Sequence, residues 1–294
     1  MANVNYAAEY SRALSNAYPY LSYFGAIWAA NNSNLYKSGM GKTMYIPSMT
    51  VSGSRAVNRD QITGTFNRNW DNALTPVTLQ MDREWDTLID PMDIDETNEV
   101  ATIANITKTF NELQKIPEMD AFLAAKLASF VTTPDTTTLT SANILEKWDA
   151  YLAAMTDARV NRDRVEAYMT PAVYKLLKEA AGITRFVSTD EGFRGIDRNV
   201  ARLDGVRITE VPSDIMKTAF VFTEGFVPAE TAKGINLLLV DPMAVAAPVK
   251  YETSMISAPS AQSKGKYLYY ERYYYGAFAM PNRAAGIVAN VNAT

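Results

Sequence analysis

The sequence predicts an α+β protein in which a helical stretch lies between two β-rich segments and is followed by a mixed α/β section. Apolar residues alternate with a period of two at 43–51 and again at 267–280, as expected for strands. Residues 103–113 repeat apolar side chains at the three- and four-residue spacing of an amphipathic helix. Asp204-Gly205, between two apolar runs, is a two-residue hairpin signal.

Composition excludes several classes of catalyst. The chain has 294 residues, no histidine, no cysteine and a net charge of -4. It therefore has no Ser-His-Asp or Cys-His catalysis, no zinc site of Cys and His ligands and no disulfide. The mild negative charge argues against a dedicated basic surface for nucleic acid. An enzyme of this composition would depend on carboxylates, Lys, Tyr or Ser/Thr, or on a borrowed cofactor.

Residues 1–36 are predicted to form an N-terminal arm. They carry one acid and one base, and they are too few to form a core of their own. Their aromatic residues, which include Tyr10 and Trp28, are expected to pack either on the rest of this chain or on another chain. No signal-peptide pattern and no apolar stretch of membrane-spanning length is present, so we expect an intracellular protein.

Residues 37–88 are predicted to form an extended loop built as a projecting β-hairpin. Strands are expected at 43–51 and 76–81, on either side of a polar middle segment. A loop of this length is typically either functional or disordered. The middle segment contains the side chains of Arg55, Arg59, Arg68 and Trp70.

Residues 89–134 are predicted to be helical. The acids near the start, which include Asp93, Asp95 and Glu96, suit the positive end of a helix dipole. Pro117 is expected to break or kink the helix. A second helical stretch leads to a Thr/Pro-rich linker at 132–140, which is the clearest domain boundary.

Residues 135–246 are predicted to form a mixed α/β domain, and residues 247–294 return to β structure. The elements expected in the mixed domain are a helix with an apolar face from Leu145 to Met155, a strand at 164–169, a helix that begins at Thr170-Pro171 and ends at Gly182, the hairpin at Asp204-Gly205, and a buried strand at 235–240.

The final β segment is rich in tyrosine. Tyr267, Tyr269, Tyr273 and Tyr275 are expected on one face of a strand, with Tyr270 and Tyr274 on the other. This segment has five basic and two acidic residues, whereas residues 89–134 have eight acidic and three basic. The opposite signs favour self-association over capture of a single polyanion.

Four patterns invite a catalytic or ligand-binding interpretation, and each has a simpler explanation. Residues 39–43 end like a phosphate-binding loop but lack its first glycine and the following helix. The acids between Asp90 and Glu99 lack the glycine of a calcium loop. Ser263 and Lys266 match Ser-x-x-Lys but lie in a predicted loop. The tyrosine strand offers stacking for bases, although strand tyrosines more often pack in sheets. We therefore expect no catalytic residue, cofactor or metal ion.

The order of these parts resembles the major capsid proteins of tailed bacteriophages, which share the Hong Kong 97 fold. The strings DRVEAYMTPAVYKLL, NVARLDGVRITEVPS and INLLLVDPMAVAAPVKYE are similar to the strand-helix unit, the hairpin and the return strand of the family's axial domain, and YYERYYYGAFAMPNRAAGIV is similar to its closing strand. On this resemblance residues 37–88 correspond to the extended loop, 93–115 to the spine helix within the peripheral domain at 89–134, 135–246 to the axial domain, and 247–294 to the return to the peripheral domain.

The resemblance implies a structural protein without enzymatic activity, which self-assembles into the hexamers and pentamers of an icosahedral shell around double-stranded DNA. The extended loop would lie over a neighbouring subunit. The implied partners are further copies of the chain, a portal protein, a separate scaffolding protein or none, decoration proteins, and packaged DNA through weak non-specific contact, with no membrane. The implied location is the virion, after assembly in the host bacterial cytoplasm. Lys37 and Lys42 lie at the base of the loop, so no lysine-asparagine crosslink is expected.

The candidate subunit-interface residues come from the hairpin, the acidic helix and the arm. They are Arg55, Arg59, Arg68, Trp70, Asp93, Asp95, Glu96, Tyr10 and Trp28. Two alternatives stay open. An encapsulin-type nanocompartment shell would enclose an enzyme cargo instead of a genome, and a carboxylate-dependent hydrolase would show two facing acids in a deep cleft.

Overall fold

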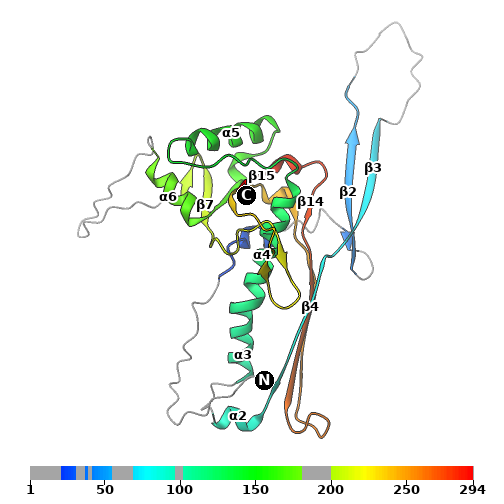
Figure 1. Ribbon diagram of the computed structural model, residues 1–294. Helices are drawn as coiled ribbons and strands as arrows, with labels where there is room; N and C mark the ends of the chain where they lie inside the picture. The colour runs from blue at the N-terminus through cyan, green and yellow to red at the C-terminus, as the bar shows by residue number, and fades with distance from the viewer. Residues whose placement is uncertain are drawn as a thin grey trace, which may run out of the picture.

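The computed structural model describes residues 21–30, 37–38, 42–54, 69–96, 102–180 and 200–293. In Figure 1 a two-stranded hairpin projects at one end of the molecule, a long helix and a narrow sheet extend toward the other end, and a helix-covered sheet lies to the side. The element order confirms the predicted α+β class.

The projecting hairpin consists of β2 (Thr43–Val51) and β3 (Trp70–Thr78). The two strands pair antiparallel along their whole length, and the short strand β1 (Lys37–Ser38) pairs with the base of β2. The predicted strand at 43–51 is therefore confirmed. The polar segment expected to begin at 52 and end at 72 is shorter, because Trp70 already belongs to β3.

The predicted strand at 76–81 is wrong in its bounds. β3 ends at Thr78, and Leu79 is buried under the hairpin base. A new strand, β4 (Met81–Ile89), then pairs with β13 (Tyr267–Tyr275) instead of with the hairpin. Residues 81–88, which the sequence placed in the extended loop, thus form part of a different sheet.

This second sheet, which we call the peripheral sheet, has the strand order β12-β13-β4, with β12 spanning Val249–Ser257. The predicted tyrosine alternation is confirmed, because Tyr269, Tyr273 and Tyr275 are buried while Tyr270 and Tyr274 are partly exposed. The buried face is turned toward the long helix, whose Phe110 stacks on Trp85 of β4 at a ring distance of 4.0 Å.

The long strand expected at 267–280 is interrupted at Gly276. Beyond it, Phe278 and Ala279 form β14 (Phe278–Ala279), which pairs with β11 (Val245–Ala246). A Cβ atom on Gly276 would lie 3.2 Å from the side chain of Leu79, so the close approach of the hairpin base favours glycine here.

One continuous helix is formed by α3 (Ile103–Phe110), a single π-helical turn (Asn111–Lys115) and α4 (Ile116–Phe130). Thr102 caps its start, since the side chain accepts a hydrogen bond from a backbone N–H one turn on, at 3.3 Å. Pro117 lies directly after the π turn. Proline lacks an N–H and crowds the carbonyl of the preceding turn, and the wider π turn accommodates both effects without ending the helix.

The acids expected in the first turns of this helix lie instead in a separate short helix, α2 (Pro91–Glu96). The prediction of one helix over 93–115 is therefore wrong at its N-terminal end. Asp93 occupies the first turn of α2, where the helix dipole favours an anion.

The mixed section contains a five-stranded sheet in which β5 and β7 run parallel and the other neighbours run antiparallel. Its strands, in spatial order, are β15 (Ile287–Val291), β10 (Ile235–Val240), β5 (Glu166–Met169), β7 (Val206–Glu210) and β6 (Arg202–Leu203). Two helices, α5 (Ile144–Asp157) and α6 (Pro171–Glu179), pack on it (Figure 1).

Most predictions for this section are confirmed. β10 has the predicted bounds, and Trp148 on α5 is buried. Thr170 begins α6, and Asp204 and Gly205 both have the positive φ angles of the predicted turn. Gly182, expected to close α6, lies outside the described residues.

The remaining elements are short and connect these parts. They are α1 (Gly25–Trp28), β8 (Phe220–Val221), β9 (Val227–Pro228) and 3₁₀ turns at Arg162–Arg164, Pro242–Ala244 and Ala284–Gly286. The largest apolar core lies where α1, α4, β13 and the five-stranded sheet meet. Among the described residues, no helix has the length and apolar character needed to cross a membrane.

Candidate assembly surfaces

The hairpin presents an exposed apolar face. Opposite residues of antiparallel strands point to the same side, so the register assigns several apolar residues to one face. These residues are Tyr45, Met49, Val51, Trp70 and Leu74. Val51 is 71% exposed and Leu74 57%. Contiguous apolar surface of this kind marks contact sites for other molecules, so we call these five residues the hairpin face.

The opposite side of the hairpin is buried only at its base. There Met44 and Ile46 pack in a small apolar cluster with Leu79, Phe278 and Met280. Farther out the hairpin stands away from the rest of the described chain (Figure 1). Its direction is therefore determined at the base.

An ionic cluster reinforces this base. Lys42 Nζ lies 2.5 Å from Asp82 Oδ2, and Arg272 donates hydrogen bonds to both Asp82 oxygens at 3.0 and 2.9 Å. The hydrogen bond from Arg272 lowers the pKa of the Asp82 carboxyl, assisted by Lys42 and opposed by burial. These side chains are partly exposed, so the cluster contributes more to the direction of the hairpin than to overall stability.

The outer face of the peripheral sheet is the second exposed surface. β4 presents there a row of three acids, Asp82, Glu84 and Asp86. Toward the far tip the surface becomes apolar, because Leu88 lies opposite Leu268 and both are exposed. This face therefore combines an acidic row with an apolar tip.

The inner face of the peripheral sheet is held to the long helix by buried charges. Lys115 of the π turn pairs with Glu271 of β13, and both side chains are largely buried. Tyr269 donates a hydrogen bond to the second oxygen of Glu271 at 3.0 Å. Satisfied charges in this position hold the sheet and the helix in one arrangement.

Asp120 of α4 holds the first described segment, residues 21–30. Its fully buried carboxylate accepts hydrogen bonds from the Ser22 hydroxyl at 3.0 Å, the Tyr23 N–H at 2.8 Å and the Trp28 indole N–H at 3.2 Å. Trp28 thus packs on its own chain, which is one of the two arrangements expected for the arm aromatics. Its ring is still partly exposed, and its contact with a neighbouring subunit stays a prediction.

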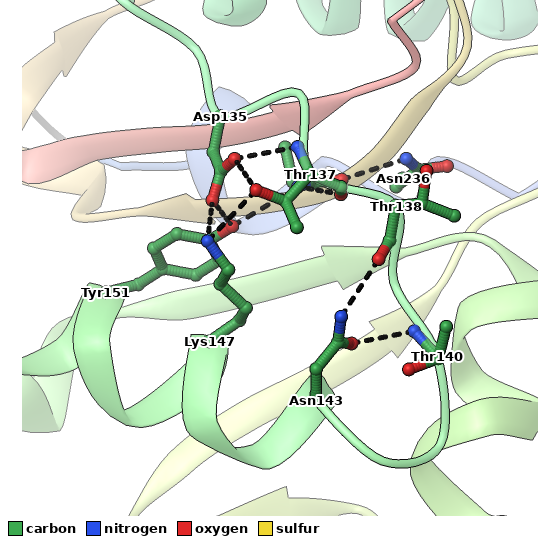
Figure 2. Close-up of polar contacts among 9 residues, drawn as sticks. Asp135, Thr137, Thr138, Thr140, Asn143, Lys147, Tyr151 and Asn236 are labelled. Atoms are coloured by element: carbon green, nitrogen blue, oxygen red, sulfur yellow. Dashed lines mark hydrogen bonds and ion pairs between the residues drawn. The ribbon is translucent and has the colours of Figure 1, made fainter.

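A second polar network anchors the linker between α4 and α5 (Figure 2). One oxygen of Asp135 accepts hydrogen bonds from the N–H and hydroxyl of Thr137, at 2.8 and 2.6 Å. The other accepts from Lys147 Nζ at 2.9 Å and the Tyr151 hydroxyl at 2.8 Å. Burial acts to raise the pKa of Asp135, but these hydrogen bonds outweigh it, so the pKa lies well below its usual range.

The backbone of the same residue bridges to Asn290 of β15. The linker that the sequence identifies as a boundary is consequently attached to the five-stranded sheet at Asp135. The position of that sheet relative to the long helix is therefore specified by side chains on both sides of the boundary.

The predicted interface residues fall at opposite ends of the molecule. Trp70 lies in the hairpin, whereas Asp93, Asp95 and Glu96 lie in α2 at the other end (Figure 1). Within one chain the structure does not bring these two groups together. Four further candidates, Arg55, Arg59, Arg68 and Tyr10, lie outside the described residues.

Sequence reasoning missed most of the hairpin face. Met44 and Ile46 identified the strand, but Tyr45 and Met49 on the alternate positions are also apolar. An apolar pattern on both faces of a strand indicates two contact surfaces, one for the chain's own core and one for another layer. That signal could have identified the hairpin face.

The rejected motifs have structural roles. Lys42, from the sequence that resembles a phosphate loop, belongs to the ionic cluster. Ser263 accepts a hydrogen bond from the Ser260 N–H in a turn, at 2.9 Å. Within the described ranges no group of three or more acidic side chains is arranged to hold a metal ion.

No protein-family model and no curated protein matches the sequence. Solved structures do match. The chain is similar to the capsid structure of cyanophage P-SCSP1u, with a TM-score of 0.69 and 12% identity over 98% of this chain and 93% of that one. It is similar to the mature capsid of bacteriophage PhiM1, with a TM-score of 0.66 and 12% identity over 100% and 97% of the two chains.

A chain of Mycobacterium phage Che8 is also similar, with a TM-score of 0.64 and 15% identity over 98% of both chains. These likenesses extend over nearly the whole chain at low sequence identity, and they therefore show the fold. The chain has the Hong Kong 97-type capsid fold that its sequence predicted.

Proposed function

We propose that this protein is the major capsid protein of a tailed bacteriophage, a non-enzymatic protomer that self-assembles into the hexamers and pentamers of an icosahedral shell around double-stranded DNA. The hairpin face carries the proposal. It exposes five large apolar side chains on an element that has a core only at its base. The likeness to capsid structures over nearly the whole chain supports it.

A neighbouring copy of the chain is the proposed occupant of the hairpin face. Full burial of a Leu, Val or Met side chain contributes about 1.5–3 kcal/mol, so several such side chains outweigh the cost of ordering a contact. Every subunit of a shell would repeat the contact. A modest free energy per contact is then sufficient for a stable assembly.

The other proposed partners are a portal protein, a scaffolding protein where assembly requires one, and decoration proteins. Contact with packaged DNA would be weak and non-specific, in keeping with the chain's net charge of -4. The proposed location is the virion capsid, after assembly in the host bacterial cytoplasm.

Electron microscopy and sedimentation of the purified protein test the proposal. We expect closed shells, or rings of five and six subunits. Met49→Asp places a charge on the hairpin face and should abolish assembly while the protomer stays folded. Thr50→Asp is the matched control, because Thr50 is the next residue of β2, is also exposed and points to the opposite side.

Normal shells from the Met49→Asp variant would contradict the role of the hairpin face. A wild-type protein that stays monomeric or dimeric even with a candidate scaffolding protein would contradict the proposed function itself. A deep cleft with two facing acids in such a small oligomer would favour the hydrolase alternative.

A further inference from the structure

β12 forms an unprotected edge of the peripheral sheet. In the order β12-β13-β4 it pairs with β13 on one side, and no described segment pairs with its other side. Its outer half, 253–257, contains no charged residue, proline or glycine, and the register irregularity is confined to Val249/Tyr251. Met255 is 59% exposed and Ile256 58%.

Proteins normally protect a sheet edge with lysines, prolines, bulges or very short strands, because its unpaired N–H and C=O groups accept strands from other chains. The outer half of β12 has none of these protections. An added strand from a partner would satisfy the backbone groups and shield the apolar side chains.

β3 is a second edge of the same kind. It is the last strand in the order β1-β2-β3. Pro76 lacks an N–H, which leaves 70–75 as the part able to pair along its full length. Within that part, Trp70 and Leu74 are 49% and 57% exposed.

The two edges lie at opposite ends of the molecule. In Figure 1 the hairpin projects at one end, while the outer half of β12 leads to the sheet tip near α2 at the other. A contact between two different surfaces is heterologous, and repeated heterologous contacts close into rings when the rotation between copies allows it. Pairing of β12 with a second β12 would instead be isologous and would stop at a dimer.

We propose that β3 of one copy pairs with the outer half of β12 of the next copy, so that the peripheral sheet continues across the subunit boundary. The inference rests on the proposed function, because it specifies how the hairpin of a capsid protomer engages its neighbour. Backbone hydrogen bonds between the two edges supply the contact. Trp70 and Leu74 on one edge and Met255 and Ile256 on the other lose exposed apolar surface.

Cysteine crosslinking tests this pairing, since the natural chain contains no cysteine. Asn72→Cys is combined in turn with a cysteine at each position from Thr253 to Ser257, which covers the registers that place Asn72 beside the outer half of β12. Opposite Cβ atoms on paired strands lie about 4.5–5.5 Å apart, close to the separation that a disulfide spans. The single variants Asn72→Cys and Ser254→Cys are the controls.

After oxidation of the assembled protein, non-reducing electrophoresis should show a covalent ladder up to five or six subunits for at least one double variant and for neither single variant. Dimers from Ser254→Cys alone would overturn the inference in favour of β12 pairing with itself. Wild-type rings or shells without crosslinking in any double variant would overturn the inference and leave the proposed function standing. Absence of any wild-type assembly would overturn both.

Discussion

Arg83 and Glu118 form a two-pronged ion pair between β4 and α4. Arg83 Nε donates to Glu118 Oε1 at 2.7 Å, and Nη2 donates to Oε2 at 2.9 Å. Glu118 is 4% exposed and also accepts a hydrogen bond from the Tyr275 hydroxyl at 3.1 Å. The pair therefore closes the peripheral sheet on the long helix through buried, fully engaged charges.

Replacement of Arg83 by Met should strongly destabilise the protomer. It leaves the carboxylate of Glu118 buried without its cation, which typically costs about 3–5 kcal/mol in the free energy of unfolding. Lys42→Met, which removes a partly exposed partner of Asp82, is the control and should cost about 0–1 kcal/mol. Urea denaturation measures both, and equal losses would contradict the assigned role of the buried pair.

Asp135 should make stability depend on pH in the acid range. Its folded-state pKa is lowered, so its stabilising effect is present above the unfolded-state value of about 3.9 and is lost progressively as the pH falls below that value. Asp135→Asn should therefore be less stable than wild type at pH 7, and the difference should narrow toward pH 3. Thermal unfolding at both pH values measures this. A difference that does not change with pH would contradict it.

Gly286→Ala should destabilise the five-stranded sheet and its connection to β11. A Cβ atom there would lie 2.9 Å from the Cβ of Ala244 and 3.3 Å from that of Asp241. Overpacking of a buried site typically costs about 1–3 kcal/mol. Gly53→Ala is the matched control, because no atom lies within 4 Å of its added Cβ. Thermal unfolding midpoints should separate the two variants, and similar midpoints would count against the close packing at Gly286.

Joint replacement of Arg59 and Arg68 by Glu should leave a folded protomer that forms no shells. The two arginines belong to the segment between β2 and β3, and reversal of their charge would oppose contact with an acidic surface of a neighbour. Lys175→Glu with Lys178→Glu on α6 is the control charge reversal and should not prevent assembly. Circular dichroism checks folding and electron microscopy checks assembly. Normal shells from the arginine variant would refute the prediction.

Much of the fold could be predicted because its signals are local. The alternation at 43–51, the helical spacing at 103–113 and the turn at Asp204-Gly205 each depend on residues close together in the chain. The structure confirms each of these elements. The two long strand predictions failed at Leu79 and Gly276, where contact between distant segments ends a strand whose local pattern continues.

Less of the candidate site could be predicted. Trp70 was identified as an exposed hairpin residue, whereas Met49 and Leu74 beside it were not. The acids of α2 were assigned to the long helix, because the sequence pattern does not show that a new N-cap at Thr102 begins a separate helix. Charge and periodicity identify candidate residues, but the face that stays exposed depends on what packs against the other face.

The sequence by itself determined the fold class, the order of the parts and the absence of histidine and cysteine chemistry, since these follow from composition and short-range periodicity. Only the tertiary structure decided that β4 pairs with β13, that Glu118 and Asp120 are buried, and that the hairpin leaves one apolar face exposed. The physical reason is that strand pairing and burial are contacts between segments far apart in the chain. A local pattern specifies that a strand has a face to bury, and the tertiary contacts decide which partner covers it.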